Sequence, residues 1–240
     1  MEKVFFTLIF SVMAVDFAWA ADNTNRYMRE CLSIISAPKV KVTSSYGKLK
    51  YNLEKDSRYL REETARKYKE KGLEIPEGFE PVGLTKVRDG FTVNMNVGQA
   101  EISHGYRCLY PQNIDVHLGF YVPTIYILKD LDKSSCTYEV ALRHEKTHMQ
   151  IYLEALDYFL PELKKASDGL FEKVGVRIAA PDEHTPTIAE QLHEDYVNAL
   201  NEKVEAWRQE VEAEQLKLDT PEQYLLESKL CERVEAARKR

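Results

Sequence analysis

The stretch His144-Glu145-Lys146-Thr147-His148 carries two histidines four residues apart, with a glutamate directly after the first. On a helix, residues at this spacing lie on one face, so the two imidazoles could hold a single Zn²⁺. The carboxylate of Glu145 lies beside that face, where it could take a proton from a water molecule on the metal. The sequence therefore predicts a helix that carries the centre of a zinc site.

The segment around this motif, residues 137–160, is amphipathic at the helical period, with Ser134 or Ser135 as its N-cap. Both histidines fall on the apolar stripe, and Glu145 falls at its flank. Buried imidazoles need polar partners, so two interpretations stay open: a metal site, or core histidines hydrogen-bonded to the backbone or to carboxylates. The stripe consists of Thr137, Val140, Ala141, His144, His148, Ile151, Tyr152, Ala155 and Phe159.

The motif alone is an incomplete zinc site, because a zinc hydrolase needs three protein ligands and one open position. A second long helix opens at Thr185-Pro186 and runs to about Lys217, and its apolar seam should pack on the motif helix. Extending that seam backwards by four residues reaches His193, which we predict as the third ligand, with Glu190 as the alternative. The seam consists of Val197, Leu200, Val204, Trp207 and Val211. Further possible ligands are His104, His117, His184, Asp219, Glu222 and Tyr224.

Ahead of the motif helix the sequence favours strands, over residues 39–46, 49–52, 91–97, 106–110, 114–118 and 124–128. Tyr46-Gly47 reads as a hairpin turn between the first two, and the short connections indicate mostly antiparallel pairing. A charged helix over residues 57–71 lies between these strands and ends at Gly72. After the motif helix, which Pro161 interrupts and which ends near Asp168, the chain is almost entirely helical.

Together these elements predict an α+β, zincin-like fold in which a mixed, mostly antiparallel sheet packs on the long HExxH helix and long C-terminal helices follow. We expect a single domain over residues 21–240, with a β-rich part at about 31–130 and a helical part at about 135–240.

The N-terminus has the pattern of a secretory signal peptide. An apolar run over residues 4–15 follows Lys3, and Ala18-Trp19-Ala20 suits cleavage before residue 21. The run is too short to span a bilayer, so we expect no integral membrane segment after signal cleavage. Residues 1–20 are therefore predicted to be removed, which makes the mature protein periplasmic or extracellular.

The four cysteines, an even number, suggest two disulfides in an oxidising compartment. Three connectivities are possible, and the preferred one joins Cys108 to Cys136 and leaves Cys31 with Cys231. None of them forms a C-x-x-C pair, which argues against a cysteine zinc site.

The net charge of −6 argues against a nucleic-acid partner, which would favour a basic surface. The expected partner is a peptide or protein substrate, and the oligomeric state is left open.

The run Cys136-Thr137-Tyr138-Glu139, leading into residues 142–148 and followed by long helices, resembles a bacterial family: the uncharacterised secreted proteins predicted to be zinc-dependent, HExxH-type proteases. The resemblance covers most of the mature chain in layout, and only the motif region is specific. It implies a peptidase. Family members often carry a histidine-rich segment in the last helical region, whereas residues 218–224 of this chain contain no histidine.

These observations lead to the hypothesis of a secreted zinc metallopeptidase. Zn²⁺ would be held by His144, His148 and His193, and Glu145 would act as the general base on the attacking water. The alternative is a secreted, non-catalytic protein that metal stabilises and whose long helices bind a partner.

Overall fold

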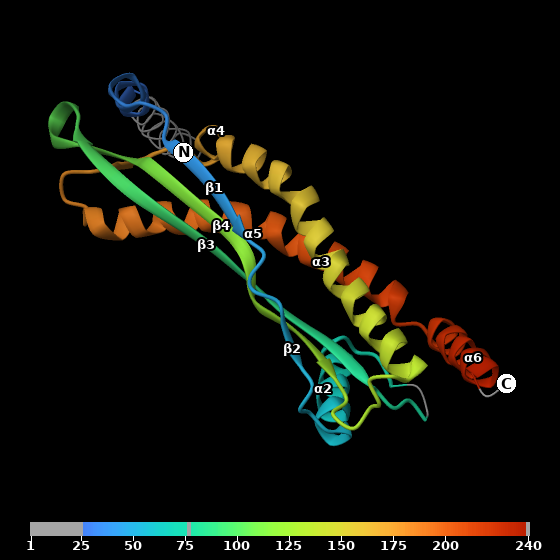
Figure 1. Ribbon diagram of the computed structural model, residues 1–240. Coiled ribbons are helices and arrows are strands. Elements are labelled where there is room, and N and C mark those ends of the chain that lie inside the picture. The colour runs from blue at the N-terminus through green and yellow to red at the C-terminus, as the bar shows by residue number, and fades with distance from the viewer. Residues whose placement is uncertain (1–25, 76–77, 239–240) are drawn as a thin grey trace, which may run out of the picture. The chain divides into compact units, whose positions relative to one another are not determined.

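The computed structural model describes residues 26–75 and 78–238 (Figure 1). The predicted signal peptide, residues 1–20, lies outside this part of the chain. The chain forms two compact units, each assembled from three segments. Of the described residues, unit 1 comprises 26–42, Val93–Val116 and Lys164–Glu202, and unit 2 comprises 43–92 without 76–77, His117–Leu163 and 203–238. The HExxH motif lies in unit 2, whereas His193 and Glu190 lie in unit 1.

A single long strand, β4 (Arg107–Ile127), organises the sheet, because every other strand pairs with it. The segments that we predicted as separate short strands merge into β4 and into β3 (Gly83–Glu101). The remaining strands are β1 (Lys39–Ser45), β2 (Lys50–Asn52) and β5 (Arg177–Ala179). β2 runs parallel to β4 and β5 runs antiparallel to it.

The prediction of a mostly antiparallel, zincin-like sheet was wrong. β1 and β2 do not form a hairpin with each other; both pair with β4. The side chain of Thr43 in β1 contacts His117 in β4, and Lys50 in β2 lies opposite Thr124 in β4. In both cases the partner residue comes 74 positions later in the sequence. β1 and β2 therefore run along β4 in the same parallel register. Gly47, with φ of 67°, lies so close to β4 that a Cβ would come within 2.6 Å of the Phe120 carbonyl oxygen. The glycine therefore allows close approach to β4 instead of reversing the chain.

The predicted helices are present. The side chain of Asp56 caps α2 (Ser57–Glu70), and the Ser135 hydroxyl accepts a hydrogen bond from the Tyr138 amide, 3.1 Å away, at the start of α3 (Cys136–Asp168). The α3 helix continues through Pro161 and carries the motif. The other described helical segments are residues 26–34, the 3-10 helix η1 (Ser103–Gly105), α4 (Leu170–Val174), α5 (Thr185–Leu218) and α6 (Pro221–Arg238).

Within unit 2, α5 packs on α3 through its apolar seam, as we predicted. The indole nitrogen of Trp207 donates to the Ala155 carbonyl at 3.1 Å, and its ring stacks on Phe159 with centroids 5.4 Å apart. The buried positions of α5 recur every three or four residues: Leu192, Tyr196, Leu200, Val204, Trp207, Val211 and Gln215. This stripe brings Gln215, not His193, against the motif helix.

The cysteines form two pairs at disulfide distance, but not in the connectivity that we preferred. Cys31 pairs with Cys108 in unit 1, with Cα atoms 5.5 Å apart, and Cys136 pairs with Cys231 in unit 2, at 5.3 Å. The difference arises because the start of β4 packs with the helix over residues 26–34, while α6 lies against the start of α3. In the part of the chain that is described, no helix has the length and apolar character needed to cross a bilayer.

Candidate metal centre

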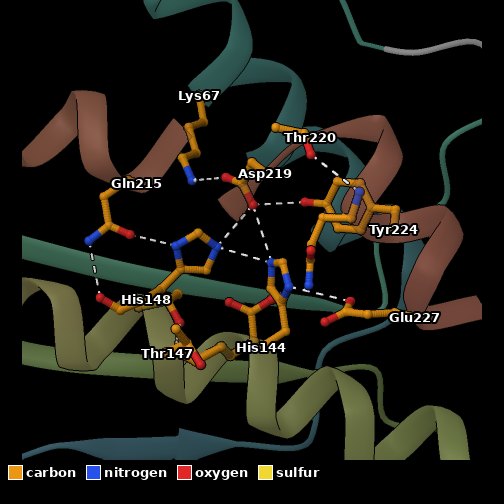
Figure 2. A network of polar contacts seen from close by, with 12 residues as sticks. Lys67, His144, Thr147, His148, Gln215, Asp219, Thr220, Tyr224 and Glu227 are labelled. Atoms are coloured by element: carbon orange, nitrogen blue, oxygen red, sulfur yellow. Dashed lines mark hydrogen bonds and ion pairs between the residues drawn. The ribbon is translucent and has the colours of Figure 1, made fainter. Parts of the chain in front are cut away.

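Three side chains converge in unit 2: His144 and His148 from α3, and Asp219 from the junction between α5 and α6 (Figure 2). The two Nε2 atoms lie 3.1 Å apart. Oδ1 of Asp219 lies 3.3 Å from Nε2 of His144 and 2.9 Å from Nε2 of His148. The side chains are 4%, 5% and 8% exposed, so water screens the cluster poorly.

The spacing of these atoms suits a metal ion. Ligands bonded to a tetrahedral ion at about 2.0–2.1 Å lie about 3.3 Å from one another, close to the separations found here. Two imidazole nitrogens and one carboxylate oxygen also form a donor set that transition metals accept. The cluster of His144, His148 and Asp219 could therefore hold a metal ion through three ligands.

Gln215 determines which nitrogen of His148 is available to a metal. Its Nε2 donates to the backbone carbonyl of His148 at 3.0 Å, so its Oε1 must be the atom that faces Nδ1 of the same residue. Nδ1 is then the protonated nitrogen, and it donates to Gln215. In the neutral ring, Nε2 consequently presents its lone pair toward Asp219 and His144.

Glu227 of α6 faces the other ring nitrogen of His144. Nδ1 of His144 lies 3.4 Å from Oε2 of Glu227 and makes no hydrogen bond within the described chain. A carboxylate facing Nδ1 favours the proton on that nitrogen, which leaves Nε2 of His144 as the second lone pair at the centre. Two nitrogen lone pairs and an anionic oxygen so close together repel one another, and a cation between them, either a metal ion or a proton on one Nε2, removes that repulsion.

Asp219 is held at both oxygens. Its Oδ1 accepts a hydrogen bond from the Tyr224 hydroxyl at 2.8 Å, and its Oδ2 pairs with Nζ of Lys67 at 3.1 Å (Figure 2). Because Lys67 occupies Oδ2, only Oδ1 faces the two imidazoles, which favours a single bond to a metal. Burial disfavours the anion, but the contacts with His144 and His148 outweigh that penalty and hold the pKa of Asp219 well below its usual range.

The same environment raises the pKa of two other side chains. Burial lowers the pKa of His144, but its hydrogen bond to Asp219 and the charges of Glu145 and Glu227 more than compensate, so the net shift is upward. Burial and the charge of Asp219 raise the pKa of Tyr224, which keeps its proton and donates it. In the absence of a metal ion, the cluster therefore favours protonation of His144.

Glu145 lies beside the cluster and is not part of it. The residue is 6% exposed, and burial raises the pKa of its carboxyl group. The Thr85 hydroxyl donates to its backbone carbonyl at 2.9 Å, which ties α3 to β3. Gly83 lies directly against the carboxylate, since a Cβ there would come within 2.6 Å of Oε1. Glycine at this position leaves room for the glutamate.

A cavity of about 530 Å³ opens next to the cluster, and its walls include His144, Glu145 and Tyr224. Its size falls within the range of about 300–1,000 Å³ typical of ligand sites. A second void, of about 30 Å³, lies between Glu145, His148 and Asp219, and could hold one water molecule. Glu145 lines both spaces, as do Gly83 and Tyr224, so its side chain borders the small void beside the cluster as well as the larger cavity.

The predicted third ligand, His193, is not part of this cluster. It lies in unit 1, where Nε2 contacts the Val93 carbonyl oxygen at 3.1 Å. A backbone contact thus accounts for this histidine without a metal. The alternative, Glu190, also belongs to unit 1. His117 contacts Thr43 and His184 contacts Thr187.

Asp219 was only one of several further possibilities in the sequence, yet a signal for it was present. Extending the α5 seam forwards by four residues from Val211 reaches Gln215, and four more reach Asp219. The backward extension reaches a histidine, which is a familiar zinc ligand. The forward direction leads to the residues that contact the motif.

Comparison of the chain with protein-family models, with curated proteins and with solved structures finds no match.

Proposed function

We propose that the protein is an exported zinc-dependent peptidase, with His144, His148 and Asp219 as metal ligands and Glu145 as general base. The observation that carries this proposal is the convergence of three metal-binding atoms beside a buried glutamate on the wall of a cavity. The resemblance of the motif region to secreted zinc-dependent proteases agrees with it. The two cysteine pairs agree with an oxidising compartment outside the cytoplasm.

Zinc is the metal that we propose, because two imidazoles and one carboxylate match the three protein ligands of its catalytic sites. When bound, it would supply Lewis acidity and bring the pKa of water to about 7, which makes water a nucleophile at neutral pH. The outer contacts of Gln215, Glu227, Tyr224 and Lys67 would keep the three ligands in place during the reaction.

In the chemical step, Glu145 first accepts a proton and then donates it. Its carboxylate takes a proton from water as the water oxygen attacks the carbonyl carbon of a peptide bond. The carbon–nitrogen bond then breaks, and Glu145 passes the proton to the departing amine nitrogen. The position of this side chain at the border of both the small void and the larger cavity suits a group that serves both water and substrate.

The test compares wild-type protein with Glu145→Gln, a change of nearly the same shape that removes the base. We expect zinc content to be unchanged and hydrolysis of a peptide mixture, followed by mass spectrometry, to fall by about 10²–10⁴-fold. Glu154→Gln is the matched control, because Glu154 is exposed on the same helix and contacts Gln150. Zinc-loaded wild-type protein that cleaves no peptide would contradict the proposal and favour the non-catalytic interaction protein.

A further inference from the structure

The wall that α6 contributes to the larger cavity is acidic. Residues Tyr224, Glu227, Ser228, Cys231, Glu232 and Glu235 line the cavity, and their spacing places them along one side of α6. Glu80 and Glu145 add two more carboxylates from other segments. Among the described residues that line the cavity there is no lysine and no arginine.

The orientation of α6 is opposite to that of an ordinary amphipathic helix. Its leucines face solvent: Leu225, Leu226 and Leu230 are 54%, 64% and 43% exposed. The side chain of Glu227, on the cavity side, is only 15% exposed. Burial of apolar surface would favour the reverse arrangement. The pairing of Cys231 with Cys136, together with the contacts of Tyr224 and Glu227 at the metal centre, holds the acidic side inward.

Of the five carboxylates that line the cavity, two face a partner within the protein, and a third, Glu145, is the proposed general base. Glu80 pairs with Arg61 at 3.1 Å, and Glu227 faces the buried Nδ1 of His144, which has no hydrogen bond in the described chain. Glu232 and Glu235 are exposed, and no ion pair with another described residue is found for either. These two negative charges at the cavity are therefore available to a ligand.

The remaining walls suit the stem of a long side chain. The rings of Phe79 and Tyr224 contact each other, with centroids 4.9 Å apart, and Val140 and Ala141 add aliphatic surface. Lysine and arginine carry apolar stems that pack on such surfaces and a charged head that remains near water or a carboxylate. Aromatic faces also attract the charged head.

We propose that this cavity binds a lysine or arginine side chain of a peptide substrate, with the stem against Phe79 and Tyr224 and the cationic head at Glu232 and Glu235. This inference rests on the proposed peptidase function and gives it a substrate class: peptides with a basic residue close to the cleaved bond. Acidic peptides would be repelled by the same wall.

The experiment uses fluorescent peptides that are identical except for one residue, which is lysine, glutamine or glutamate. Binding is measured by anisotropy with zinc-loaded Glu145→Gln protein, and hydrolysis with zinc-loaded wild-type protein. The test variant is Glu232→Gln/Glu235→Gln. The matched control is Glu210→Gln/Glu222→Gln, which changes the charge equally at exposed positions that do not line the cavity.

We expect the lysine peptide to bind roughly tenfold more tightly than the glutamine peptide, because the two exposed carboxylates form ion pairs that water weakens. The preference should disappear in the test variant, persist in the control, and weaken at high salt. Equal binding of all three peptides, or a preference that survives in the test variant, would overturn the inference. Selective binding without any hydrolysis would contradict the proposed function but would still support a cavity that binds a basic side chain.

Discussion

Gln215 holds His148 at two points: its side-chain oxygen accepts from Nδ1 of the ring, and its amide nitrogen donates to the His148 backbone carbonyl at 3.0 Å. A single amide thus restrains both the ring and the helix that carries it. Gln215 is 1% exposed, so water does not compete for either bond. The orientation of one proposed ligand therefore depends on a residue from a different helix.

Gln215→Leu removes both bonds while keeping a side chain of similar size. We expect zinc affinity to fall by about 10–100-fold, as is usual when a partner of a metal-bound histidine is lost. The free energy of unfolding of the metal-free protein should fall by about 1–3 kcal/mol, because the Nδ1 proton of His148 loses its acceptor. Competition with a chromophoric chelator measures the first effect and urea unfolding the second. Gln209→Leu, at an exposed position of α5, should change neither.

Asp219→Asn tests the third ligand directly. Asparagine keeps the shape of the side chain but loses the negative charge, so zinc affinity should fall by more than about 100-fold, beyond the effect of losing an outer partner. The same chelator competition measures it. Glu222→Gln, three residues along the chain and exposed, is the control. Affinity within a few-fold of wild type in Asp219→Asn would remove this residue from the centre.

His193→Ala should leave zinc affinity unchanged, because the contact of His193 is with the Val93 carbonyl in unit 1. The substitution should cost some stability, about 1 kcal/mol, through the lost hydrogen bond. Parallel measurements of zinc affinity and urea unfolding separate these two effects. Weaker zinc binding at unchanged stability would mean that the sequence-based choice of ligand was correct after all.

The two cysteine pairs should differ in their effect on the metal centre. Cys136→Ala/Cys231→Ala releases α6, which carries Tyr224 and Glu227, so zinc affinity should fall together with stability. Cys31→Ala/Cys108→Ala should lower stability alone. The pairs close loops of similar length, with sequence separations of 95 and 77, so each loss should be about 2–4 kcal/mol. An equal loss of zinc affinity in both double variants would contradict this, because it would trace the loss to general destabilisation and not to the release of α6.

The motif helix could be predicted because its signals are local. Ser135 caps α3 as expected, and the spacing of His144 and His148 is a property of one helix face. The pairing of β1 and β2 could not be predicted in this way, since their partner lies 74 residues away along the chain. Gly47 looks the same in the sequence whether it reverses the chain or permits close approach to β4.

The third ligand shows a second limit of local reasoning. The apolar seam of α5 predicts correctly which side of the helix faces α3. Along the 34 residues of α5, however, the buried side turns around the helix axis relative to that seam. Toward the N-terminus the buried positions are Tyr196 and Leu192, so Val197 and His193 rotate away from the stripe. Toward the C-terminus the stripe reaches Gln215 directly. The buried side of this part of α5 is marked by Tyr196 and not by Val197. A buried tyrosine is hard to distinguish from an exposed one in the sequence.

The central claim is that two imidazoles and one carboxylate hold a single zinc ion. X-ray absorption at the zinc edge, together with metal analysis of the zinc-loaded protein after gel filtration, tests it most directly. We predict about one zinc per chain, with nitrogen and oxygen neighbours at about 2.0–2.1 Å and scattering from two imidazole rings. Loss of zinc on the column, or scattering that requires three imidazoles, would contradict the account.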